Sequence, residues 1–80
     1  MITSEQVRAA RALLRWEQKD LAEASKISLP SIKRLEGQPG LLAAQDRTVE
    51  AIQNAFQNAG VLFLSSGAMI EGGAGVRLKS

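Results

Sequence analysis

The chain has 80 residues, 45% of them hydrophobic, with ten Lys or Arg against eight Asp or Glu and a formal net charge of +2. It contains no Cys and no His, which excludes a disulfide framework, a zinc finger and the usual general base or thiolate nucleophile of an enzyme. We therefore predict no catalytic residue, no metal ligand and no cofactor. No apolar run approaches the ~18 residues of a membrane-spanning helix, and the start of the chain lacks the apolar segment of a signal peptide. We expect one small cytoplasmic domain.

The first predicted helix begins at Thr3 or Ser4 and runs to about Leu14, because a hydroxyl residue caps a helix start well. Its apolar stripe is predicted to contain Val7, Ala10, Leu13 and Leu14. Trp16 follows, and a lone Trp in so small a domain is more often a core anchor than a platform for stacked bases.

Residues 18–37 are the most informative stretch, because their pattern predicts two short amphipathic helices joined by a tight turn. In the second helix, Ser28 is placed to cap the start, Pro30 falls in the first turn and Gly37 provides the stop. The apolar residues spaced to enter one shared core are Leu21, Ile27, Ile32 and Leu35. The opposite face of the second helix is basic.

Positive charge is concentrated in the same half of the chain. Residues 1–36 hold seven Lys or Arg against five acids, whereas residues 37–80 hold three of each. The stretch 25–35 is basic and contains no acid. This distribution favours a protein that binds a short nucleic-acid site. The alternative is an ordinary helical hairpin whose basic face is simply solvated.

The next segment, 37–45, is a predicted loop, because Pro39 and Gly40 forbid a helix there. Leu41 and Leu42 are both expected to point inward. A further helix is predicted over 46–59, and its expected apolar stripe is Val49, Ile52, Phe56 and Ala59. Gly60 is suited to the left-handed position that ends a helix.

The tail differs in composition, with five of the seven glycines between Gly60 and Gly75. Residues 61–64 form an apolar run that predicts a strand, and residues 75–79 alternate like a second strand. The alternative is a frayed tail. We predict a domain over 1–60 and a C-terminal β extension over 61–80.

These patterns together resemble the Cro and λ-repressor-like family of regulators, the xenobiotic-response-element type of helix-turn-helix protein. The resemblance covers roughly residues 4–60 and is carried by RAARALLRWEQKDLAEASKIS, SLPSIKRLEG and RTVEAIQNAF. Its joint pattern consists of Gln18, Leu21, Ala22, Ile27, Ser28, Ile32 and Glu36. Two positions depart from the family: Lys26 stands where glycine is usual, and Glu17 where Ser, Thr or Asn is commoner.

The resemblance implies a mainly α fold, a four-helix λ-repressor-like domain with a helix-turn-helix, plus a short C-terminal β hairpin. It implies a sequence-specific DNA-binding transcriptional regulator, a repressor, that binds a two-fold related operator as a homodimer through residues 28–36. The expected location is the cytoplasm, on the nucleoid. The alternative function is an antitoxin that binds a toxin and regulates its own promoter. A third hypothesis is a helical adaptor with no role on DNA.

The position in the family motif and the helical wheel also predict the DNA contacts. The predicted base contacts are Leu29, Pro30, Ser31 and Arg34. Arg34 has the fork that binds guanine O6 and N7. The predicted phosphate contacts are Gln18, Ser28, Lys33, Arg15 and Arg47. Glu36 is expected to cap a helix or pair with an Arg of the first helix.

Assembly is expected to involve the tail. One such helix contacts too few base pairs for specific binding, so two must act about 34 Å apart. The surface left for joining two copies belongs to part of helix 46–59 and to the two strands. The predicted interface residues are Val61, Leu62, Phe63, Leu64, Val76 and Leu78.

Overall fold

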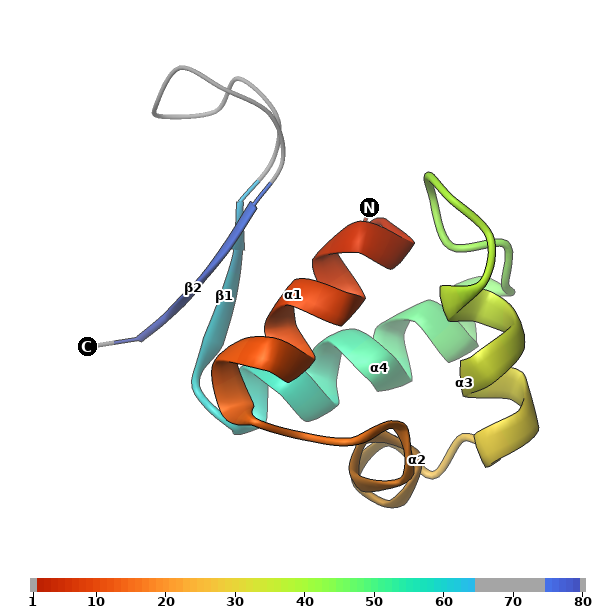
Figure 1. The fold of residues 1–80 in the computed structure, drawn as a ribbon, viewed down its shortest axis with the longest axis horizontal. Coiled ribbons are helices and arrows are strands. Elements are labelled where there is room, and N and C mark those ends of the chain that lie inside the picture. Colours follow the sequence, from red (N-terminus) through yellow and green to blue (C-terminus); the bar gives the residue numbers. More distant parts are fainter. Residues whose placement is uncertain (1, 65–74, 80) are drawn as a thin grey trace.

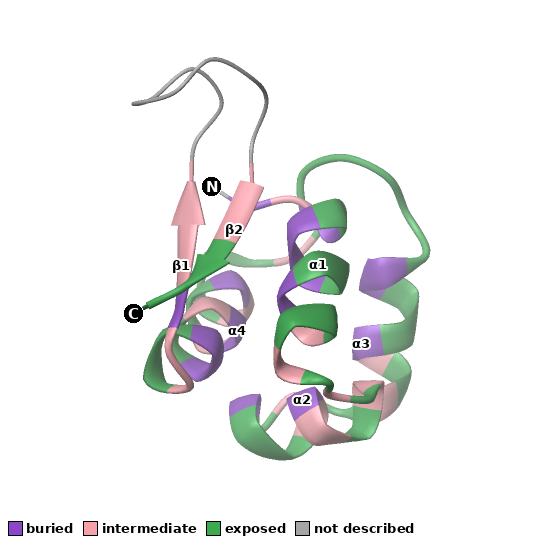
Figure 2. Ribbon diagram, turned by 60° about the vertical axis from the view of Figure 1, so that its left-hand side comes forward, coloured by how far each residue is buried: buried purple, intermediate pink, exposed green. Residues whose placement is uncertain are grey.

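The computed structural model describes residues 2–64 and 75–79, which form four α-helices and a two-stranded antiparallel sheet (Figure 1). In chain order these elements are α1 (Ser4–Leu14), α2 (Gln18–Ser25), α3 (Leu29–Glu36), α4 (Asp46–Asn58), β1 (Val61–Leu64) and β2 (Gly75–Leu78). The prediction of a mainly helical chain with a short C-terminal hairpin is confirmed. In Figures 1 and 2 the hairpin and α3 lie on opposite sides of the molecule, with α1 between them.

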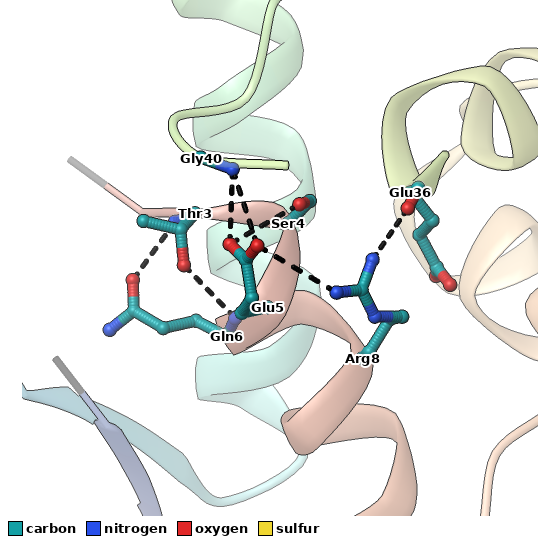
Figure 3. Close-up of polar contacts among 7 residues, drawn as sticks. All are labelled: Thr3, Ser4, Glu5, Gln6, Arg8, Glu36 and Gly40. Atoms are coloured by element: carbon teal, nitrogen blue, oxygen red, sulfur yellow. Dashed lines mark hydrogen bonds and ion pairs between the residues drawn. The ribbon is translucent and has the colours of Figure 1, made fainter. Parts of the chain in front are cut away.

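A reciprocal pair of hydrogen bonds fixes the start of α1. The Thr3 hydroxyl accepts from the Gln6 backbone N–H at 3.1 Å, and the Gln6 side-chain oxygen accepts from the Thr3 N–H at 2.9 Å (Figure 3). This capping box satisfies two backbone donors that the first turn leaves free. Ile2, just before it, is only 2% exposed and accepts from the Leu42 N–H at 3.2 Å. The first residues of the described chain therefore belong to the core.

The core combines side chains from every helix and from both strands. Its fully or nearly fully buried members are Ile2, Val7, Ala10, Leu21, Ile32, Leu35, Leu42, Val49, Ile52, Ala55, Phe56 and Val61 (Figure 2). Trp16 packs on this cluster, with its ring stacked on Phe56 at 5.6 Å, and Phe63 meets Phe56 edge-on at 5.8 Å. The prediction that Trp16 is a core anchor is confirmed.

Two leucines predicted to point inward are exposed instead. Leu13 is 39% exposed, because it lies about 100° around α1 from Leu14, which packs on the core. Leu41 is 59% exposed while Leu42 is 5% exposed. The backbone of Leu41 forms an isolated antiparallel bridge with Thr3, and successive side chains of an extended segment point to opposite faces. Only one of the two leucines can therefore face the core.

The hairpin continues directly from α4. Gly60 adopts φ +97° and donates to the Gln57 carbonyl at 3.0 Å, which ends the helix as predicted and turns the chain into β1. In the antiparallel register Val61 pairs with Leu78 and Phe63 with Val76. The second strand ends at Leu78, one residue earlier than predicted. The SSGAMIEGGA connection lies outside the described residues.

Candidate nucleic-acid interface

The segment from α2 to α3 is built around buried apolar side chains. Leu21 of α2 is fully buried, Ile32 and Leu35 of α3 are 1% and 2% exposed, and Ile27 between the helices packs partly buried on the core. All four residues predicted to enter the core therefore do so. Ala22 also packs on this cluster, where its small side chain allows a close approach of the two helices. Through these contacts the core fixes the orientation of α3.

The turn between the two helices contains a left-handed lysine. Lys26 has φ +64° and ψ +21°, the backbone conformation that disfavours every residue with a Cβ atom. The Ser25 hydroxyl stabilises this turn, because it donates to the Leu21 carbonyl at 2.7 Å and accepts from the Ile27 N–H at 3.3 Å. The lysine that stands in place of a glycine therefore adopts a left-handed conformation despite its Cβ atom.

The start of α3 is capped by a serine pair. The Ser28 hydroxyl accepts from the Ser31 N–H at 3.3 Å and donates to the Ser31 hydroxyl at 2.9 Å. Pro30 lies in the first turn, where its missing N–H costs no helical hydrogen bond. Pro30 and Arg34 are exposed, whereas Leu29 and Ser31 are half-buried. The four residues predicted to contact bases thus lie together on the side of α3 that faces away from the buried Ile32 and Leu35.

The residues predicted to contact phosphates have different surroundings. Lys33 on α3, Arg47 in the first turn of α4 and Arg15 after α1 are all exposed. Gln18 is half-buried at the start of α2, and its amide donates to the Glu36 carboxylate at 3.2 Å. The Ser28 hydroxyl is occupied in the cap. Three of the five are therefore solvated cations, and two are polar groups already bonded within the chain.

Glu36 joins α3 to α1 and α2, as expected from the sequence. Its carboxylate, with 4% of the side chain exposed, accepts two hydrogen bonds of 2.7 Å from the Arg11 guanidinium. Arg11 also donates to the Trp16 carbonyl at 3.0 Å, and the Arg8 guanidinium donates to the Glu36 backbone carbonyl at 2.6 Å (Figure 3). These bonds hold the end of α3 against α1.

The cations of the chain fall into two groups. Arg8, Arg11 and Lys19 each lie within 4 Å of a carboxylate. Among the described residues the remaining cations form no such ion pair, and they include Lys26, Lys33 and Arg34. Residues 25–35 therefore carry three cations that no carboxylate of the described residues neutralises, whereas the arginines of α1 support the fold.

An open hollow of about 670 Å³ lies between α3 and the segment that begins α4. One wall is formed by the turn and the outer part of α3, with Lys26, Ile27, Ser28, Ser31 and Arg34. The other wall is formed by Ala43, Ala44, Gln45 and Thr48. Its hydroxyl groups, cations and small side chains favour a polar, negatively charged occupant rather than an apolar one. We call this feature the α3–α4 hollow.

The residues predicted for a dimer interface divide between the two faces of the hairpin. Val61 is fully buried, and Phe63 and Val76 pack partly buried on the core. Because side chains alternate along a strand, Leu62 and Leu64 lie on the opposite face. Leu78 is 47% exposed at the end of β2. Val61 consequently offers no surface to a second copy. The half-buried Leu62 and Leu64 on the outer face remain candidates, and so does the exposed Leu78, which pairs with Val61 on the other face.

Sequence reasoning missed the role of Gln6. Its side chain is buried, with the residue 4% exposed, and its amide group donates to the Leu64 carbonyl at 3.1 Å and to the Gly75 carbonyl at 3.0 Å. Its oxygen meanwhile accepts from the Thr3 N–H. One glutamine therefore caps α1 and attaches the end of β1 and the start of β2 to that helix.

Comparison with known proteins returned no matching protein-family model and no matching curated protein. None of the helices in residues 2–64 and 75–79 combines the length and the apolar character needed to cross a membrane.

Proposed function

We propose that the chain is a sequence-specific DNA-binding transcriptional regulator, a repressor of the λ-repressor-like type, in which α2 and α3 form the helix-turn-helix. In this proposal α3 enters the major groove, Arg34 binds a guanine edge, and Leu29, Pro30 and Ser31 contact neighbouring bases. Lys33, Arg15 and Arg47 contact phosphates. Gln18 also contacts a phosphate in this proposal, with its amide donating to a phosphate oxygen in place of the Glu36 carboxylate.

One observation carries the proposal: the two sides of α3 differ completely in environment. Ile32, Leu35 and Glu36 are buried and fix the helix to the core. Lys33 and Arg34 are exposed and have no ion-pair partner among the described residues. A helix presented in this way, capped at its start and carrying free cations, is suited to bind a polyanion.

The proposal also includes a homodimer that uses the outer face of the hairpin. Leu62 and Leu64 lie on the face of the sheet away from the core, and the hairpin lies on the opposite side of the molecule from α3 (Figure 2). A two-stranded sheet is marginal alone and gains stability from further burial. Joining two copies there leaves both α3 helices uncovered.

The first experiment tests base recognition. Selection from random duplexes should yield a two-fold related motif for the wild-type protein. Arg34→Ala should weaken binding to the selected site by about 1–3 kcal/mol and relax the preference at one base pair in each half-site. Lys79→Ala, which removes a cation from the hairpin side, serves as the control and should leave the motif unchanged. An unchanged motif with Arg34→Ala would contradict the assignment.

Phosphate contacts are tested by salt dependence. Lys33→Ala should weaken binding to all duplexes alike and reduce the slope of log affinity against log salt by about 0.9. A wild-type protein with no salt-dependent affinity for any duplex would refute the DNA-binding function itself and favour a helical adaptor.

The dimer is tested by single substitutions rather than by truncation. Removing the hairpin would take Val61 and Phe63 out of the core, so loss of assembly would be confused with unfolding. Leu62→Asp on the outer face should shift sedimentation to the monomer while the helical circular dichroism is retained. Leu41→Asp makes the same change at an exposed loop leucine and should remain dimeric. A Leu62→Asp protein that still sediments as a dimer would place the interface elsewhere.

A further inference from the structure

Lys26 has a backbone conformation that favours glycine, yet it carries a long, charged side chain. Its φ of +64° lies in the region that glycine adopts without cost, so glycine is the residue that local stability favours there. The chain has a lysine there instead. Strained positions of this kind persist where the surrounding structure enforces them, and they are concentrated at functional sites.

The surroundings of Lys26 indicate what that function is. The residue lines the α3–α4 hollow together with Ser28, Ser31 and Arg34, the face proposed to meet DNA. It is exposed, and within residues 2–64 and 75–79 no carboxylate lies within ion-pair distance of its ammonium group. Its charge is thus available to a ligand that occupies the hollow.

We propose that Lys26 is a DNA-backbone contact, and that a sugar–phosphate strand lies along the α3–α4 hollow beside it. The inference rests on the proposed DNA-binding function and adds to that function a residue at the turn. A phosphodiester strand fits the chemistry of the walls, because hydroxyl groups and cations bind phosphate oxygens while the two alanines leave room for the chain.

An alternative role for Lys26 is purely structural. Lys26 follows the last turn of α2, where a cation interacts favourably with the helix dipole. That role would stabilise the fold without any effect on DNA. The two explanations therefore differ in what removal of the charge does to affinity.

The test uses Lys26→Gly, which removes the charge and the backbone strain together. We expect opposite effects on two measurements: the melting temperature rises by about 2–6 °C, and duplex affinity falls about 3- to 10-fold at moderate salt. The salt slope should decrease by about 0.9, equally for the selected site and for unrelated duplexes.

Three further variants separate the explanations. Lys26→Asn, neutral and tolerant of the left-handed region, should lose affinity as Lys26→Gly does. Lys26→Arg keeps both the charge and the strain and should bind like the wild type. Lys79→Ala controls for net charge and should keep the wild-type slope.

The outcomes distinguish this inference from the function on which it rests. Wild-type protein with no salt-dependent duplex binding refutes the function. Wild-type binding with an unchanged slope and affinity in Lys26→Gly refutes the contact alone and leaves the helix-dipole role. A loss confined to one base pair of the operator also overturns the proposal, because it would make Lys26 a base contact.

Discussion

Replacing Arg11 with Met removes the cation that faces the Glu36 carboxylate while it keeps most of the aliphatic packing of the side chain. The carboxylate has only 4% of its side chain exposed, so it cannot recover its lost bonds from water. Removing one partner of a buried ion pair costs about 3–5 kcal/mol. The Gln18 amide still donates to Glu36, so we expect the lower end, about 3 kcal/mol.

That cost is large for a domain of this size. A chain of 80 residues has a total stability of about 4–12 kcal/mol, so Arg11→Met should remove a quarter or more of it. The melting temperature should fall by about 10–25 °C. Urea unfolding followed by circular dichroism measures the change, with an unaltered slope showing that the two-state transition is preserved.

The control and the double variant make this prediction specific. Lys19→Met makes a similar change in an exposed pair with Glu17, whose side chains are 69% and 71% exposed, and should cost less than about 1 kcal/mol. Combining Arg11→Met with Glu36→Leu should restore most of the loss, because no buried charge is then left unpaired. A cost for Arg11→Met as small as that of the control would refute the reasoning.

Three more substitutions test single contacts. Gln6→Glu keeps a cap acceptor but turns a carboxylate toward two strand carbonyls, and should cost about 2–3 kcal/mol in urea unfolding. The exposed control Gln57→Glu, which places a carboxylate in the last turn of α4, should cost only about 0.3–1 kcal/mol. Gly60→Ala, at φ +97°, should cost about 1–2 kcal/mol by the same assay. The Glu5 carboxylate accepts hydrogen bonds from the backbone N–H of Glu5 itself and from the Gly40 N–H, and these bonds lower the pKa of Glu5. The contribution of Glu5 to stability is therefore complete above the ordinary carboxyl pKa of about 4.3, and it is lost as the pH falls through the lowered pKa of the folded state. The difference in melting temperature between wild type and Glu5→Gln should accordingly vanish in acid. A difference that persists there would contradict this assignment.

Local signals in the sequence predicted the helices well, because each end is marked by its own chemistry. Thr3 and Ser28 cap helices where their hydroxyl groups were expected to do so. Gly60 takes the left-handed position predicted for it. The apolar spacing of Ile32 and Leu35 likewise identified the buried side of α3, and with it the exposed side that forms the candidate interface.

The failures arise where a side chain's environment depends on distant segments. Both Leu41 and Leu42 were expected to point inward, but pairing of the loop backbone with Thr3 makes the two side chains point apart. The buried position of Ile2 depends on the same pairing. Gln6 looked like an ordinary capping residue, because its partners on the hairpin are 58 and 69 positions away. No local pattern records such contacts.

Long-range contacts give α1 a part in the proposed function, and of these contacts only the pairing of Glu36 with an arginine of α1 was expected from the sequence. Arg11 holds the end of α3 through Glu36, and Gln6 holds the hairpin through Leu64 and Gly75. These two residues are five apart, so the attachments lie about 7.5 Å apart along one helix and about 140° apart around it. In the proposed dimer, α1 therefore connects the helix that contacts DNA to the strands that join the subunits. The spacing of the two half-sites then depends on α1, although α1 carries neither the base contacts nor the interface.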